Sequence, residues 1–157
     1  KAELAAIKLT ALNTLLHFKT YNTRISEENV LDIIKDYDIV VDGSDNFPTR
    51  YLLNDACVKL NKPLVSGSVL KFEGQTSVFN YKNGPTYRCL FPEPPADVQN
   101  CASNGVLGVL PGIIGTVMAN EVIKIILGKG EVLSGKLFVF KTFEIAFTSS
   151  LVLLEVR

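Results

Sequence analysis

Apolar residues recur at three- and four-residue steps across residues 1–16, with no glycine or proline between them. This spacing predicts an opening helix, because it places the apolar side chains on one face. Aromatic and β-branched residues between His17 and Ile25 predict a strand. A second helix is expected to start at Ser26, whose hydroxyl can cap it, and to run to about Asp36.

A short apolar run follows, from Asp38 to Gly43, and it ends in a turn. Such a run is typical of a parallel strand that is buried on both faces of a sheet. Pro48 suits the first turn of the next helix, which is expected to reach about Asn61. Because helices and strands alternate over this half of the chain, their order predicts half of a doubly wound α/β domain.

The pattern changes after this point. Two strand candidates, Leu64–Leu70 and Gly74–Tyr81, lie too close together for a crossover helix between them, so we expect an antiparallel hairpin. Residues 83–104 hold four of the seven prolines and show no periodicity, which predicts a long loop.

The segment Val106–Leu127 is apolar on nearly every side, but polar residues such as Glu121 interrupt it. A buried core helix is therefore expected rather than a membrane span. Residues 137–140 and 145–154 predict two closing strands. Together these elements predict one α/β domain, in which parallel strands are followed by antiparallel strands in a mixed sheet.

Charge and cysteine content narrow the class of protein. Sixteen basic and sixteen acidic residues give no net charge. This argues against a nucleic-acid or membrane-surface partner, since proteins that bind these anionic partners need an excess of positive charge. Three cysteines are too few for a disulfide framework, and an odd number cannot all pair within the chain. They suit a reducing cytoplasm. The chain opens with Lys1 and its single methionine is Met118, so we expect a piece of a longer chain.

The segment Asp42–Arg50 concentrates candidate chemistry at the carboxyl end of a predicted strand, where ligands bind in open α/β sheets. Its two acids, its amide and its arginine could hold a metal ion, a nucleotide phosphate and a substrate carboxylate. The structural alternative is that Asp45 or Asn46 only caps the following helix and that Arg50 is solvated.

Cys101 is a second candidate, because it lies in the predicted loop, whereas Cys57 lies on an apolar helix face. No histidine lies near Cys101 in the sequence, so an incidental thiol is the alternative to a nucleophile. No glycine-rich phosphate-binding motif occurs in the chain.

Five segments, in order and over essentially the whole chain, resemble E1-like activating enzymes. The resemblance is to the bacterial adenylyltransferases of sulfur-carrier proteins, of the ThiF/MoeB/HesA type, which serve molybdopterin or thiamine synthesis. The segments that carry it are Asp42–Cys57, Lys62–Gln75, Tyr87–Pro92, Gly105–Gly115 and Asn120–Ile125.

This resemblance implies a Rossmann-like fold and an enzyme that uses ATP and Mg²⁺ to adenylate the C-terminal glycine of a ubiquitin-like sulfur carrier. By position, Asp45 would help hold Mg²⁺-ATP, and Asn46 and Arg50 would shape the same pocket and contact the carrier's tail. Lys1 would contact phosphate, and Cys101 would be the thiol that receives or passes on the carrier. The family also implies a homodimer.

Several departures from the family pattern limit the resemblance. Thr86 stands where zinc-binding members have a cysteine, and no second cysteine pair occurs, so no zinc is expected. The family's glycine-rich loop, ribose-binding acid and catalytic arginine would precede Lys1, so the chain alone is expected not to adenylate. A non-catalytic module that binds a ubiquitin-like partner remains the alternative. A nicotinamide dehydrogenase is disfavoured because its fingerprint is absent.

Overall fold

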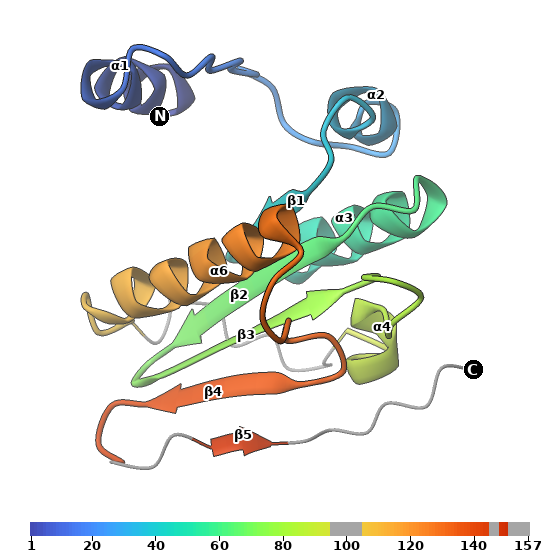
Figure 1. Cartoon of the computed structure of the whole chain (residues 1–157), viewed down its shortest axis with the longest axis vertical. Coiled ribbons are helices and arrows are strands. Elements are labelled where there is room, and N and C mark those ends of the chain that lie inside the picture. The colour runs from blue at the N-terminus through green and yellow to red at the C-terminus, as the bar shows by residue number, and fades with distance from the viewer. Residues whose placement is uncertain (95–104, 145–147, 151–157) are drawn as a thin grey trace.

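The computed structural model describes residues 1–94, 105–144 and 148–150. One sheet of five strands forms its centre, in the order β1-β2-β3-β4-β5 (Figure 1). β1 and β2 are parallel, and each later pair is antiparallel, which confirms the expected mixed sheet. The helices are α1 (Ala2–Leu12), α2 (Val30–Ile34), α3 (Phe47–Lys59), α4 (Tyr87–Leu90) and α6 (Leu110–Leu127); the strands are β1 (Val40–Asp42), β2 (Leu64–Leu70), β3 (Glu73–Phe79), β4 (Leu137–Lys141) and β5 (Thr148–Ser150).

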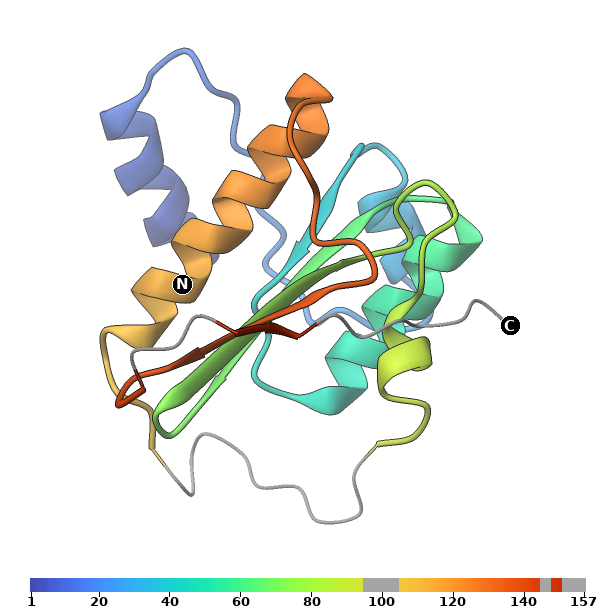
Figure 2. The ribbon, with the colours of Figure 1, turned by 60° about the horizontal axis from the view of Figure 1, so that its bottom comes forward.

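Helices cover the two faces of the sheet unequally (Figure 2). On one face α3 and α4 pack over the buried Leu64 and Phe79. On the other face α6 packs through Ile114 and Met118 against β2 and β3. Side chains alternate between faces along a strand, so each face has its own core.

Two strand glycines let α6 approach the sheet closely. A Cβ atom at Gly67 would lie 2.2 Å from the Met118 sulfur, and one at Gly74 would lie 2.5 Å from Cγ1 of Ile114. Glycine at these positions therefore lets the helix lie against the sheet. By length and composition α6 could also cross a membrane, with a mean hydropathy of 1.6, and only part of it is buried.

The N-terminal segment departs from its prediction. The opening helix ends at Leu12 rather than near Leu16, because the next residue, Asn13, adopts an extended conformation. Residues 17–25 contain no strand. β-Branched residues favour strands only where a neighbouring strand pairs with them, and this segment has no such neighbour in the described chain. α2 is also shorter than expected, because residues 26–29 form a turn in which the Asn29 side chain accepts from the Ser26 N–H (2.8 Å).

Two further elements differ from the sequence prediction. The four-residue helix α4 lies inside the expected loop, where Thr86 and Cys89 form a reciprocal cap. The core helix begins at Leu110 rather than at Val106, because Val106 pairs with Lys71 beside the β2–β3 turn. The predicted final strand is described only as β5, and its remaining residues lie outside the described chain.

Hydrogen bonds from a buried ion pair within α6 connect this helix to the segment before β4. Glu121 is 2% exposed and pairs with Lys124, while its other oxygen accepts from the Leu133 N–H (2.9 Å). Buried charges need such partners, because desolvation is otherwise uncompensated.

Glu121→Ala should therefore lower the free energy of unfolding by roughly 3 kcal/mol, since it removes the ion pair of Lys124, which keeps only the Glu131 carbonyl, and leaves the Leu133 N–H without this acceptor. Urea unfolding of the full-length protein would measure the change. Glu144→Ala is the matched control, because Glu144 makes only an exposed pair with Lys141 and its loss should have no measurable effect. Equal stability of the two variants would contradict the assignment.

Candidate active site

The site begins where the chain leaves β1 at Asp42. The Asp42 side chain is 2% exposed, and its carboxylate accepts from the Ser44 N–H (2.8 Å) and the Ser66 hydroxyl (3.4 Å). These bonds turn the chain sharply and connect the ends of the two parallel strands. The Ser44 hydroxyl oxygen is buried and has no hydrogen-bond partner among the described residues.

Asp45 and Asn46 have different roles in the turn that follows. The Asn46 side chain caps α3 by accepting from the Thr49 N–H (3.0 Å). Its amide group also donates to Oδ1 of Asp45 (3.3 Å). Asp45 is exposed and takes no part in the cap, so its carboxylate is available to a ligand. The capping alternative thus applies to Asn46 and not to Asp45.

Arg50 is buried, contrary to the solvated alternative, and is 8% exposed. Its Nε and Nη2 atoms donate to the Ser44 carbonyl (3.3 and 2.8 Å), and its guanidinium lies over the Phe47 ring at 5.3 Å. No ion pair joins Arg50 to a carboxylate anywhere in the described part of the chain. A buried cation without an acidic partner favours the binding of an anion.

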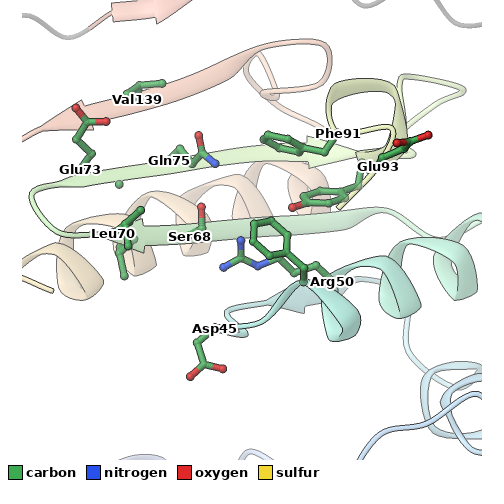
Figure 3. Close-up of a pocket in the computed structure, with 13 residues that line it drawn as sticks. Asp45, Arg50, Ser68, Leu70, Glu73, Gln75, Phe91, Glu93 and Val139 are labelled. Carbon is green, nitrogen blue, oxygen red and sulfur yellow. The ribbon is translucent and has the colours of Figure 1, made fainter. Parts of the chain in front are cut away.

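Two cavities meet beside Arg50. The larger, of about 360 Å³, lies on the sheet face that α3 and α4 cover in part (Figure 3). The smaller, of about 200 Å³, lies on the α6 face and reaches Gly43 and Ser44. Asp45, Arg50 and Ser68 line both cavities. The acidic and the basic side chain therefore both lie at the junction between the two cavities.

Aromatic side chains form one wall of the larger cavity. Tyr87 and Phe91, from α4 and the residue after it, lie 4.9 Å apart between ring centroids. Burial raises the pKa of the Tyr87 hydroxyl, and the nearby Arg50 guanidinium opposes that rise. Sequence reasoning missed Tyr87, Ser68 and Gln75 as site residues. The signal for the last two was the alternation along the predicted hairpin, which places them on one face.

Lys1, the other predicted site residue that the structure describes, is not brought to this junction. Lys1 is exposed at the start of α1, whose side chains are all unburied, and it lines neither cavity (Figure 1). Cys101 lies outside the described residues. Cys57 is fully buried on α3, and Cys89 is half-buried and contacts Thr86.

Asp45 is the one predicted metal ligand. Within residues 1–94, 105–144 and 148–150, no group of three histidine, cysteine or acidic side chains could hold a metal ion by itself. Mg²⁺ commonly binds through one or two carboxylates together with substrate phosphates and water. An exposed carboxylate at the edge of two cavities fits that mode of binding.

The sequence pattern of the ThiF family matches residues 1–153. The chain belongs to the ThiF family. It is 52% identical over 149 residues to "Adenylyltransferase and sulfurtransferase MOCS3" of Culex quinquefasciatus, covering 94% of this chain and 34% of the relative. It is 49% identical over 154 residues to "Sulfur carrier protein adenylyltransferase" of Thermus thermophilus, covering 94% of this chain and 57% of the relative. The ThiF chain thus spans between a third and three-fifths of these curated relatives.

Solved structures confirm the expected Rossmann-like, E1-type fold of this ThiF chain. The crystal structure of E. coli MccB with ATP matches with a TM-score of 0.78 at 17% identity, over 95% of this chain and 47% of that one. The structure of PaaA matches with a TM-score of 0.70 at 13% identity, over 97% of this chain and 55% of that one. At these identities the likeness shows the fold alone.

The buried thiol of Cys57 should be chemically inert. Burial, together with the negative charge of Asp42, raises its pKa from 9.0 to about 12. Iodoacetamide at pH 8 should therefore leave Cys57 unmodified in the native protein and label it in urea, because only the thiolate reacts. Peptide mass spectrometry would measure this, with the half-buried Cys89 as the comparison.

The same shift predicts a pH dependence. Unfolding restores the ordinary thiol pKa of 9.0, so the free energy of unfolding should fall as the pH rises from 9 toward 12.

Labelling of Cys57 in the native protein as fast as in urea would contradict this account.

Proposed function

We propose that this ThiF-family chain forms part of an enzyme that uses ATP to adenylate the C-terminal glycine of a ubiquitin-like sulfur-carrier protein. The observation that carries the proposal is the buried Arg50, which has no acidic partner in the described chain and lies beside the exposed Asp45 where two cavities meet. The names of the relatives from Culex quinquefasciatus and Thermus thermophilus support the reaction class.

Adenylation brings two anions together, and the junction suits that requirement. A glycine carboxylate must approach the α-phosphate of ATP, form an O–P bond and displace pyrophosphate. Both reactants carry negative charge, so a fixed cation between them reduces their repulsion. Arg50 supplies this charge in an orientation that its two hydrogen bonds to the Ser44 carbonyl hold fixed. Two cavities that share Arg50 allow the reactants to arrive from separate sides.

Asp45 is proposed as the residue that holds Mg²⁺. When bound with ATP, the ion would neutralise charge on the phosphates. Asp45 is exposed at the mouth of both cavities, and its neighbour Asn46 restrains its carboxylate. In the smaller cavity the Ser44 hydroxyl, which has no hydrogen-bond partner within the described ranges, offers a further polar contact to a bound group.

The other predicted residues receive more limited roles. Asn46 is proposed to position Asp45 and to cap α3 rather than to contact the nucleotide. Lys1 is proposed to contact a phosphate of ATP. This role requires that the part of the nucleotide site outside the two cavities lies near α1. Cys101 is proposed as the thiol that receives or passes on the carrier.

The wider setting of the enzyme is proposed on the same basis. The free thiols of Cys57 and Cys89 are consistent with a reducing cytoplasm. A homodimer would cover the exposed apolar side chains on the outer side of α6, among them Ile123, Ile126 and Leu127. We propose a carrier of either the molybdopterin or the thiamine pathway.

Asp45→Asn should lower carrier-dependent ATP–pyrophosphate exchange by roughly 100- to 1,000-fold, because the variant loses the charge proposed to hold the metal. The assay uses the full-length protein, Mg²⁺ and a sulfur carrier that ends in Gly-Gly. Asp38→Asn is the matched control, since Asp38 is exposed just before the opposite end of β1 and should leave exchange intact.

Unchanged exchange in Asp45→Asn would exclude Asp45 as the metal-holding residue. If the unaltered full-length protein binds the carrier but supports no exchange, the chain instead belongs to a non-catalytic binding module.

A further inference from the structure

No helix that the structure describes covers part of the sheet face beneath the larger cavity. Helices α3 and α4 pack over the Leu64–Phe79 end of the β2–β3 hairpin. Toward the hairpin turn, Ser68 pairs with Gln75, and Gln75 pairs in turn with Val139. These three residues line the larger cavity and form one row across β2, β3 and β4 (Figure 3). We call this row the sheet floor.

The sheet floor combines apolar and hydrogen-bonding side chains. Val139 supplies an apolar surface, whereas the Gln75 amide and the Ser68 hydroxyl can both donate and accept. Such a combination matches an extended peptide, whose main-chain groups alternate with its side chains. The volume of about 360 Å³ is within the usual range for a ligand pocket.

Charge is distributed unevenly along the cavity. Arg50 lies at the junction with the smaller cavity, whereas Glu73 and Glu93 line the larger cavity on opposite sides of the sheet floor (Figure 3). Glu73 lies 3.9 Å from the Lys141 ammonium. Glu93 is exposed and has no ion pair with any residue that the structure describes. A peptide with its terminal carboxylate at Arg50 would therefore extend past free negative charge.

We propose that Glu93, with Glu73, selects carrier tails whose side chains near the glycines are basic or neutral, where the tail passes over the sheet floor. This inference rests on the proposed function. Like charges brought together across an interface cost free energy, so a tail with acidic side chains beside Glu93 and Glu73 should bind more weakly.

Peptide binding to the full-length protein tests the proposal without requiring catalysis. The probes are fluorescent peptides that end in Gly-Gly and carry either Lys or Asp at each preceding position in turn. Fluorescence anisotropy measures their Kd in the absence of ATP. At one or more positions the Asp peptide should bind roughly tenfold more weakly than the Lys peptide.

That difference should shrink to near equality in Glu93→Gln or in the double variant with Glu73→Gln. It should persist in Glu27→Gln, which removes an exposed acid in the turn before α2. Equal affinities of Lys and Asp peptides, a difference that the cavity variants leave unchanged, or no binding of any peptide would each overturn the inference.

Failure of the inference can be distinguished from failure of the proposed function. Charge-dependent peptide binding without ATP–pyrophosphate exchange would retain the peptide site and reject the adenylation reaction. Exchange without charge-dependent binding would retain the reaction and reject the role of Glu93 and Glu73.

Discussion

The contact between the Arg50 guanidinium and the Ser44 carbonyl determines the form of the candidate site. Two hydrogen bonds from one side chain hold the turn after β1 against the first turn of α3. That contact keeps a buried cation at the end of the sheet and leaves the adjacent Asp45 exposed. A buried charge is costly unless something compensates it, and the carbonyl does so only in part. The remaining positive potential is what makes the junction of the two cavities suitable for anions.

The sheet places everything else relative to this contact. Parallel pairing of β1 with β2 brings the Asp42 carboxylate and the Ser66 hydroxyl together at one end of the sheet. The antiparallel hairpin β2–β3 extends beyond the site. On one sheet face, α3 and α4 therefore cover one end of the hairpin, and the sheet floor lines the larger cavity at the other end. Close packing of α6 at Gly67 fixes the opposite face. The larger cavity therefore lies where the antiparallel strands continue beyond the end of β1.

Local sequence patterns predicted the central elements and the loop Asp42–Arg50, because strand length, turn residues and helix caps are encoded within a few positions. They failed for residues 17–25, since β-branched composition does not reveal whether a neighbouring strand exists. They also missed α4, where a four-residue helix is too short for a periodic signal. The burial of Arg50 and the row from Ser68 to Val139 depend on contacts between distant segments, so only the folded chain shows them.

Arg50 offers the most direct test of this account. In the full-length protein, Arg50→Met replaces the buried cation with an apolar side chain of similar length and removes its two hydrogen bonds to the Ser44 carbonyl. Carrier-dependent ATP–pyrophosphate exchange is then compared with that of Arg24→Met, which alters an exposed arginine before α2. The account predicts that Arg50→Met lowers exchange by roughly 100-fold or more in protein that circular dichroism shows to be folded at the assay temperature, while Arg24→Met retains exchange. Full exchange in Arg50→Met would contradict the assignment of the buried guanidinium as the anion-binding group.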